Sequence, residues 1–311
     1  MKEKLKLILI EIRPLQWVKN LFLFTFLIFS RQLFVVHQDL VLIIAFISFT
    51  FLTSGIYIFN DIFDYPFDRI NEQKKNRPIA SDRISRSEGW KLFILFTSLA
   101  FITNLVFRLG EYFLLIELMY FVLMVSYSVY FRNIAIIDSL IIAMGFVIRI
   151  IGGAFVIGET QLYSWIIVVV ISLSLLISIG KRKSEMTMFE NTAHLQRKVL
   201  GKYSEDFLNS LLSGLFATTF LAYVLLTFQM DISKNIFSTT LFLLPKNIAR
   251  SPHLLKLTIP IAFYGLARYM YIIYQKKTGG TPEKALFTDI PLVVTAIIFV
   301  LSVIYLLYAG K

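Results

Sequence analysis

Long apolar runs separated by short polar stretches dominate this chain of 311 residues. A helix needs about 20 apolar residues to cross the ~30 Å hydrocarbon core of a bilayer. Nine runs come close to this length, at about 18–36, 40–60, 91–108, 112–130, 137–157, 163–180, 207–228, 254–274 and 289–309. The pattern predicts an all-α integral membrane protein with nine transmembrane helices.

The composition agrees with this prediction. Hydrophobic residues make up 57% of the chain and charged residues 16%, and the mean hydropathy is +0.72. A soluble domain could not keep so much apolar surface out of water. The net charge of +11 would suggest nucleic acid for a soluble protein, but membrane topology explains it here, and we expect no nucleic-acid partner. Cysteine is absent, which excludes disulfides, thiolate catalysis and Cys-based metal sites.

The basic residues predict the orientation in the membrane. If the N-terminus is cytoplasmic, 22 of the 31 Lys and Arg lie on the cytoplasmic side, seven lie outside and two lie within spans. Positive charge accumulates in cytoplasmic loops of membrane proteins. We therefore expect a multi-pass protein of the cell (inner) membrane, with the N-terminus and the long basic loops in the cytoplasm and the C-terminus outside.

The chain is expected to form a single transmembrane catalytic domain, 1–311, because no linker rich in Gly, Ser or Pro divides it. Two long cytoplasmic loops, 61–90 and 181–206, are separated by four spans, and each begins with a charged motif. This spacing suggests two similar halves around a central cavity open to the cytoplasm. Short connections elsewhere favour a bundle of antiparallel neighbouring helices.

Three carboxylates directly follow the second apolar run, in the stretch NDIFDYPFDR at 60–69. With ~100° per residue, a continuous helix would place Asp61, Asp64 and Asp68 within roughly 60° of each other. Pro66 lacks an amide proton, so we expect the helix to kink or end there. Carboxylates at the edge of a membrane are costly unless they are bound, and a divalent metal is the natural partner.

Cations follow the acids. Mg²⁺ prefers oxygen ligands and often binds one or two carboxylates together with substrate phosphates. We predict Asp61, Asp64 and Asp68 as catalytic metal ligands, with Asn60 ligating or orienting a water. Arg69, Lys74 and Arg77 would neutralise a diphosphate, because Arg suits bidentate phosphate contacts. The alternative is simple pairing of these acids and bases at the membrane surface.

This stretch, with KKNRPIAS at 74–81, resembles the first aspartate-rich motif of the UbiA superfamily of intramembrane prenyltransferases. Further segments resemble its decaprenyl-phosphate phosphoribosyltransferase branch: RPLQWVKN at 13–20, residues 137–149, GKRKSE at 180–185, and residues 268–283. The resemblance covers nearly the whole chain. It implies a UbiA-like bundle and transfer of 5-phosphoribose from phosphoribosyl diphosphate to a polyprenyl phosphate, with Mg²⁺ present and diphosphate released.

The chain departs from the family pattern at two places. Asp82 stands where the family usually has Gly after RPIAS, which predicts a changed loop turn. Superfamily members that alkylate aromatic rings usually carry a second DxxxD motif after the sixth span. Lys181, Arg182 and Glu185 occupy that place here. A basic patch favours a pocket for an additional phosphate over a second metal site.

Four further residues are candidates for substrate contact. Gln16 and Lys19 open the first span within a motif of the resemblance, and the alternative for Lys19 is a snorkelling interfacial anchor. Arg149 lies within the fifth span, where a charge should face the bundle interior. It either forms a structural ion pair or contributes to the substrate cavity. Tyr127 ends the fourth span and is also typical of an interfacial aromatic belt.

We therefore predict a Mg²⁺-dependent polyprenyl-phosphate phosphoribosyltransferase that serves lipid-linked pentose and cell-envelope glycan synthesis. Its partners are phosphoribosyl diphosphate, a polyprenyl phosphate and the bilayer, and association into a homo-oligomer stays open. The first alternative is transfer of a prenyl group from prenyl diphosphate to an aromatic acceptor, which expects a second acidic motif. The second is a membrane transporter, which expects broken helices or repeats at mid-membrane.

Overall fold

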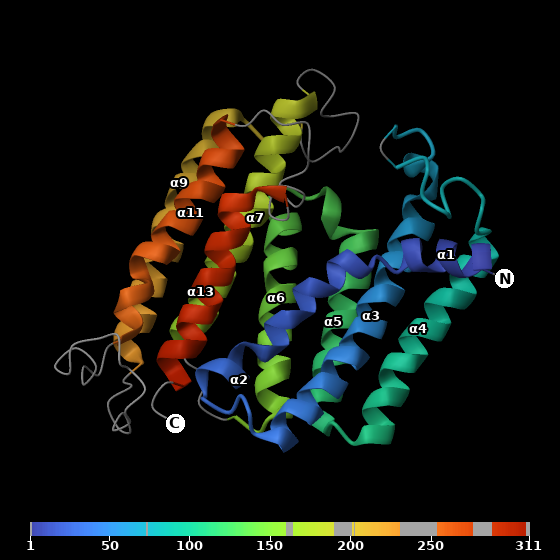
Figure 1. The fold of residues 1–311 in the computed structure, drawn as a ribbon. Helices are drawn as coiled ribbons and strands as arrows, with labels where there is room; N and C mark the ends of the chain where they lie inside the picture. Colours follow the sequence, from blue (N-terminus) through green and yellow to red (C-terminus); the bar gives the residue numbers. More distant parts are fainter. Residues whose placement is uncertain are drawn as a thin grey trace. The chain divides into compact units, whose positions relative to one another are not determined.

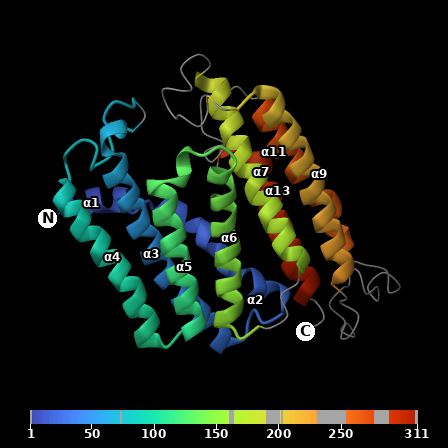
Figure 2. The ribbon, with the colours of Figure 1, turned by 180° about the vertical axis from the view of Figure 1, so that it is seen from behind.

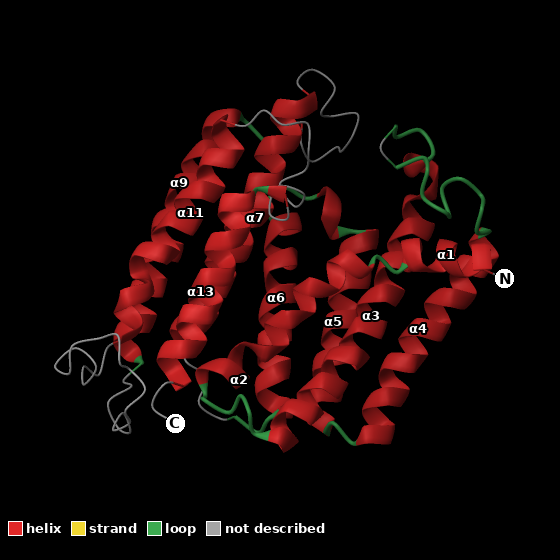
Figure 3. Cartoon of the chain, in the orientation of Figure 1, coloured by secondary structure: helices red, strands yellow, loops and turns green. Residues whose placement is uncertain are grey.

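The computed structural model describes residues 2–72, 74–159, 164–189, 201, 203–230, 254–275 and 288–308. All regular secondary structure in these ranges is helical (Figure 3). By their internal contacts, the residues form two compact units, Met1–Thr160 and Gln161–Lys311. The predicted all-α fold class is confirmed for this part of the chain.

The first unit contains a short N-terminal helix and four long helices. In the views of Figures 1 and 2, α3, α4, α5 and α6 lie side by side, and each packs against its neighbours. The segment η1 crosses α3 and α6 and contacts both. The elements are α1 (Lys2–Glu11), η1 (Pro14–Phe24), α2 (Thr25–Phe29), α3 (Val36–Asp68), α4 (Arg86–Phe107), α5 (Glu111–Val129), η2 (Phe131–Asn133) and α6 (Ile137–Val156).

The second unit is a group of packed helices. The most extensive helix pairing in this unit is between α7 and α9. Helix α11 packs against α7, α9 and α13. The elements are α7 (Ser164–Phe189), α9 (Glu205–Gln229), η5 (Leu254–Thr258), α11 (Ile259–Gln275) and α13 (Ile290–Tyr308).

Seven helices among the described residues are long and apolar enough to cross a membrane, namely α3, α4, α5, α6, α7, α9 and α13. The other two apolar runs form shorter elements. The run at 18–36 is divided between η1 and α2, and the run at 254–274 between η5 and the 17-residue α11. Hydropathy finds the apolar stretch, but it does not reveal a break in the helix within that stretch.

The predicted starts of both cytoplasmic loops were wrong. The helix α3 continues to Asp68 and α7 continues to Phe189, so the charged motifs at 61 and 181 are helical. An apolar run marks where the membrane core ends, whereas the backbone hydrogen bonds of a helix can continue into the polar region. The motif residues therefore keep helical spacing, which matters for the site.

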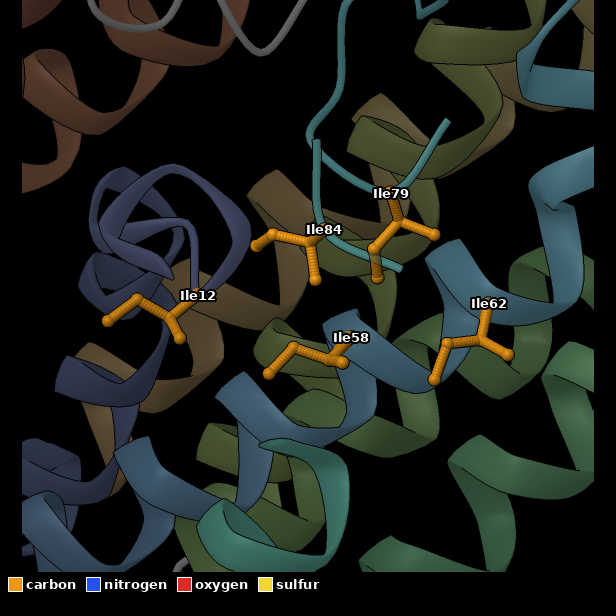
Figure 4. Close-up of a cluster of buried hydrophobic side chains, with 5 residues drawn as sticks. All are labelled: Ile12, Ile58, Ile62, Ile79 and Ile84. Carbon is orange, nitrogen blue, oxygen red and sulfur yellow. The ribbon is translucent and has the colours of Figure 1, made fainter. Parts of the chain in front are cut away.

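A cluster of five buried isoleucines joins the start of the chain to the loop after α3. Figure 4 shows these side chains, which come from three separate segments and pack together. Ile12 follows α1, Ile58 and Ile62 lie on α3, and Ile79 and Ile84 lie in the loop between α3 and α4. Each is at most 6% exposed. The cluster fixes this loop and residue 12 against the end of α3 that carries the aspartates.

The loop ends where α4 is capped at its first turn. The Ser85 hydroxyl accepts a hydrogen bond from the Glu88 amide at 3.2 Å, and the Glu88 carboxylate accepts one from the Ser85 amide at 3.1 Å. This capping box satisfies two amide groups that the helix itself leaves unpaired. Lys4 of α1 lies 2.5 Å from the same carboxylate, which ties α1 to the start of α4.

A buried polar network links three helices of the first unit. The Glu117 carboxyl of α5 is fully buried, and its Oε2 accepts a hydrogen bond from Asn104 Nδ2 of α4 at 2.9 Å. Ser48 Oγ of α3 lies 2.6 Å from the other oxygen. Polar groups within an apolar bundle are costly unless they are hydrogen-bonded, so this network specifies how α3, α4 and α5 align.

Candidate active site

Two aspartates of α3 share one guanidinium nitrogen. Asp61 and Asp68 are seven residues apart, so about 20° separates their directions on a helix of ~100° per residue. Arg77 Nη1 donates to Asp61 Oδ1 at 2.9 Å and to Asp68 Oδ2 at 2.7 Å. The aspartates are only 3% and 2% exposed. In this structure the acids and the base pair with each other, which is the alternative interpretation of the sequence, and the metal-ligand role of the aspartates stays a prediction.

Two more cations surround the pair. Arg13 donates to the same oxygen of Asp61, and Lys74 Nζ lies 3.5 Å from Asp68 Oδ1. Arg13 has a φ of 52°, a left-handed conformation that non-glycine residues rarely adopt. This turn directs the chain from α1 into η1 and leaves the Arg13 side chain at Asp61. Strain of this kind is common at functional sites.

The third aspartate points to a different partner. Asp64 lies about 60° from Asp61 on the helix, and it forms an ion pair with Arg132 of η2. Asn60 Oδ1 accepts a hydrogen bond from Ser128 at the end of α5. The acidic face of α3 is thus contacted by the loop after it on one side and by the end of α5 on the other.

The helix does not end at Pro66, contrary to one alternative of the sequence prediction. Helix α3 includes Pro66 and continues to Asp68. A proline removes one backbone donor and clashes with the preceding turn, but α3 still continues for two residues beyond it. Asp68 therefore keeps its helical relation to Asp61.

Arg69 lies away from the shared nitrogen of Arg77. Its Nη1 donates to the Tyr65 hydroxyl at 2.7 Å and lies 3.6 Å from Asp82 Oδ2. The Tyr65 hydroxyl donates to Asp82 Oδ1 at 2.8 Å. Asp82 has a φ of 57°, in the left-handed region that favours glycine. Asp82 thus places a carboxylate at a glycine-like turn, where it pairs with Arg69.

The remaining predicted contacts of the first unit lie on η1 and α5. Gln16 and Lys19 are partly buried on η1. The backbone N–H of Gln16 donates to the Arg13 carbonyl at 2.9 Å. Between them, Trp17 donates from its indole nitrogen to the Ile12 carbonyl at 3.1 Å and lies 3.2 Å from Ser54 Oγ. Tyr127 is partly buried on α5, one residue before Ser128. Their role in substrate binding stays a prediction.

Arg149 is buried among neutral partners. It is 4% exposed, and it donates to Asn20 Oδ1 at 2.9 Å, the Gly145 carbonyl at 2.7 Å and the Tyr120 hydroxyl at 2.7 Å. Its guanidinium also lies over the rings of Phe49, Tyr120 and Phe146. No acid pairs with it within the described ranges, so the structural ion pair expected as one alternative is not present there.

The second charged motif, GKRKSE at 180–185, lies on α7 in the second unit. Arg182 is 1% exposed and donates to Glu185 Oε2 at 3.0 Å, one turn along α7. The neighbouring Lys183 lies 3.1 Å from Glu205 at the start of α9. Lys181 is partly buried beside them. In the same unit, Arg268 donates two hydrogen bonds to the Asp289 carboxylate, each at 3.0 Å. The motif Gly279–Glu283 lies outside the described residues.

Sequence reasoning missed several residues of the site. Arg13 lay within a quoted motif and Arg132 at a helix end, but neither was selected as a candidate. Glu11 carried no signal at all. It is 1% exposed, and burial, followed by the charge of Asp61, raises its pKa to about 8. Only the folded chain brings residues 11 and 13 to a helix that begins more than twenty residues later.

The acidic residues fit a divalent cation in their chemistry. Asp61 and Asp68 are buried carboxylates, each with an oxygen within 3 Å of the same nitrogen, so their acceptors converge on one position that now holds positive charge. Within the described part of the chain, no three His, Cys, Asp or Glu side chains are already grouped around one point. Mg²⁺ binds through one or two carboxylates and completes its shell with water and phosphate oxygens. The observed pair meets that requirement.

Fold and site together define an integral membrane protein whose buried carboxylates lie among cations at the end of a long helix. The sequence model of the UbiA prenyltransferase family matches residues 21–288, and the chain belongs to this family. A solved UbiA homologue from Archaeoglobus fulgidus, bound to GPP and Mg²⁺, has the same fold. The TM-score is 0.67 at 18% identity, over 97% of this chain and 99% of the homologue.

Two curated relatives are decaprenyl-phosphate phosphoribosyltransferases. The relative from Corynebacterium glutamicum is 26% identical over 222 residues, which are 71% of this chain and 67% of the relative. The relative from Mycolicibacterium smegmatis is 30% identical over 208 residues, which are 63% of this chain and 62% of the relative. The aligned regions thus span about two thirds of each relative. They indicate that the chain is a transferase of the UbiA type.

Proposed function

We propose that this protein transfers 5-phosphoribose from phosphoribosyl diphosphate to a polyprenyl phosphate, such as a decaprenyl-like phosphate. The observation that carries the proposal is the arrangement around Arg77, which bridges Asp61 and Asp68 while Arg13 and Lys74 contact the same carboxylates. Acids that hold a metal and bases that hold a diphosphate are needed in one place, and here they are in contact.

The nature of the donor is supported by two further points. The relatives named above act, by their names, as decaprenyl-phosphate phosphoribosyltransferases. In addition, the motif after the sixth apolar run is basic, with Lys181 and Arg182, and does not carry the DxxxD pattern. A basic patch suits the extra phosphate of phosphoribosyl diphosphate or of the lipid acceptor. Both points favour a sugar diphosphate over a prenyl diphosphate.

In the reaction, an oxygen of the lipid phosphate forms a bond to the anomeric carbon of the ribose. The bond between this carbon and the diphosphate oxygen breaks, and the diphosphate leaves with the electron pair. Arg77, Arg13 and Lys74 exchange carboxylate contacts for contacts to the diphosphate and stabilise its charge. A phosphate monoester is anionic near neutral pH, so no strong general base is needed. The chain's contribution is positioning and charge.

We assign metal binding to Asp61 and Asp68, with Asp64 and Asn60 beside them. Bound there, Mg²⁺ supplies positive charge to the departing diphosphate. Release of Asp64 from Arg132 would make a third carboxylate accessible on the same helix. Gln16, Lys19, Arg69, Tyr127 and Arg149 are assigned to the substrate contacts of the first unit. Lys181, Arg182 and Glu185 are assigned to a phosphate contact.

The proposal includes the membrane arrangement. Nine spans would form a single catalytic domain around a central cavity open to the cytoplasm. Two of these spans would be shorter, one made of η1 and α2 and the other of η5 and α11. The N-terminus and the site would be cytoplasmic, in the cell (inner) membrane, with the C-terminus outside. This orientation is supported by the excess of Lys and Arg on that side. It lets a sugar diphosphate arrive from water while the lipid stays in the bilayer. Self-association would be tested by the mass of the purified protein.

A second candidate is transfer of a prenyl group to an aromatic acceptor. It is favoured by the family name and by the Archaeoglobus fulgidus homologue, which holds GPP and Mg²⁺. One assay separates the two candidates. Purified protein, Mg²⁺, radiolabelled phosphoribosyl diphosphate and a polyprenyl phosphate should yield an acid-labile, lipid-linked phosphoribose. No labelled lipid, in a preparation that prenylates an aromatic acceptor, would reject the proposal.

The assay has matched variants on one helix. Asp61→Asn should abolish turnover and leave the protein folded, because the amide keeps the size and loses the charge. Asp39→Asn changes the same residue type in the first turn of α3, where the Asp39 carboxylate accepts a hydrogen bond from the Phe34 backbone amide at 3.1 Å. It should keep full activity. Equal activity of both variants would remove the metal assignment.

A further inference from the structure

The N-terminal helix α1 lies across the long helices of the first unit instead of along them (Figures 1 and 2). It contacts α3, and its Lys4 lies 2.5 Å from Glu88 in the first turn of α4. On its inner side, Leu7 and Ile8 pack against the isoleucine cluster. These contacts hold α1 at the level where α4, a helix long and apolar enough to span a membrane, begins.

The outer side of α1 exposes large apolar side chains. Leu5 is 59% exposed and Leu9 is 46% exposed, and their spacing of four residues places both on one face of the helix. Contact of such a face with water is unfavourable. Beside a transmembrane helix, the acyl chains of the bilayer can cover it. Short helices with an apolar face and several lysines are typical of the membrane interface.

The first turns of α4 show the same pattern. Trp90 and Ile94 are exposed and are again four residues apart. The Trp90 ring packs edge-on against Phe59 and lies near Phe93, with ring centroids 5.8 and 5.7 Å away, and the rest of its surface is exposed. Tryptophan is enriched at the level of the lipid headgroups. Trp90 therefore indicates that the membrane boundary lies at the start of α4, which is also where α1 is held.

Exposed cations accompany these apolar side chains. They are Lys4 and Lys6 on α1 and Arg86 and Lys91 on α4. The acids nearby are Glu3, which is exposed, and Glu88, which is paired with Lys4. Positive charge therefore prevails on this surface. Basic residues next to a membrane-spanning helix attract the headgroups of anionic lipids.

We propose that α1 and the first turns of α4 form a binding surface for anionic phospholipids of the adjacent leaflet. Leu5 and Leu9 contact the acyl chains, and Lys6 and Lys91 contact the headgroup phosphates. The inference concerns the membrane surface and does not depend on which group the protein transfers. It bears on the candidate active site because α1 leads directly into Arg13, one of the cations of that site.

Collision measurements on spin labels test the position of α1. The chain contains no cysteine, so a single introduced cysteine carries the only label. Leu9→Cys, and separately Leu5→Cys, is labelled and reconstituted into vesicles of phosphatidylcholine and phosphatidylglycerol. Oxygen dissolves in the bilayer, so it should relax these labels more strongly than a water-soluble nickel chelate does. Ile102→Cys, at an exposed apolar position further along α4, is the lipid control, and Lys75→Cys in the loop before α4 is the water control.

Two outcomes of this measurement would reject the proposal. Labels at both α1 positions that respond as the Lys75 label does would show that α1 lies in water. Labels that neither reagent reaches would show that protein covers the helix, for example a second copy of the chain.

Lipid selectivity tests the charges. The vesicles contain no polyprenyl phosphate, so phosphatidylglycerol is their only anionic lipid. Its association with the protein is compared with that of phosphatidylcholine by means of spin-labelled lipids. The double variant Lys6→Gln/Lys91→Gln should lower the preference for phosphatidylglycerol at least about twofold, because each basic residue near the surface adds to the attraction.

Arg108→Gln is the control for this comparison, because Arg108 is an exposed cation at the other end of α4. It should keep the preference of the unmodified protein. An equal preference in the unmodified protein, the double variant and the control would reject the headgroup contacts, as would the absence of any preference in the unmodified protein.

Discussion

Arg149 of α6 donates a hydrogen bond from Nε to Asn20 Oδ1 of η1 at 2.9 Å, across 129 residues of sequence. The Asn20 amide in turn donates to Thr50 and Thr53 of α3, both at 3.1 Å. Asn20 is 1% exposed, so it connects a buried cation to two hydroxyl groups of another helix. One side chain thus couples three elements of the first unit.

Asn20→Ala should destabilise the protein by about 1–3 kcal/mol, because it leaves a buried guanidinium N–H without an acceptor. Thermal unfolding in detergent measures this change. Asn209→Ala of α9 is the control, since Asn209 Oδ1 is buried and has no hydrogen-bond partner among the described residues. Equal losses in both variants would show that the Asn20 contact contributes nothing specific.

Gly153→Ala should destabilise the protein by about 1–3 kcal/mol or more, as overpacking does. A Cβ at this position of α6 would collide with the backbone carbonyl of Leu23 in η1, which cannot move as a flexible side chain does. Gly214→Ala on α9 meets no atom within 4 Å and should be neutral or stabilise by up to about 1 kcal/mol. The two melting temperatures should therefore move in opposite directions or differ clearly. A stable Gly153→Ala protein would contradict the close contact of η1 with α6.

Asp82→Ala should be less stable than Asp82→Gly, by roughly 1 kcal/mol or slightly more. Both variants lose the contact to Tyr65, but only the alanine must still hold a Cβ in a left-handed conformation. Chemical or thermal unfolding of the two variants side by side measures the difference. If alanine and glycine are equivalent, the loop turn at this position does not have the described conformation.

Arg77→Gln should lower kcat/KM for phosphoribosyl transfer by about a hundredfold, the effect of removing a group that stabilises developing charge. The glutamine can no longer bridge Asp61 and Asp68 as a cation. Arg83→Gln is the control in the same loop, because Arg83 is exposed and contacts Ser81 at 2.9 Å and the Asn76 carbonyl. It should change kcat/KM by less than about threefold. A similar loss in both would point to loop folding as the cause.

The sequence was sufficient for features that depend on local periodicity. Apolar length located seven helices that are long enough to cross a membrane among the described residues, and helical spacing placed Asp61 and Asp68 on one face, because seven residues are close to two full turns. The order of acids and cations also raised direct pairing as an alternative, and Lys74 and Arg77 do contact Asp68. These are properties of short segments, and each can be inferred without knowing how the chain returns on itself.

Contacts between distant segments could not be inferred in this way. Glu11 and Arg13 reach Asp61 only because Ile12 packs on α3, and Arg132 reaches Asp64 only because α5 ends beside that helix. Arg149 was recognised as a buried cation, but its neutral partners depend on the crossing of η1 and α6. Such pairings are decided by tertiary packing, which no periodicity in one segment encodes.

The isoleucine cluster of Figure 4 determines how mobile the cationic loop can be. Arg77 precedes the anchored Ile79 by two residues, and Ser81, two residues after Ile79, donates back to the Arg77 carbonyl at 2.7 Å. The conformational entropy of bringing this guanidinium to the carboxylates is therefore lost during folding. A substrate that arrives meets a preorganised charge, and little of its binding energy is spent on ordering the loop.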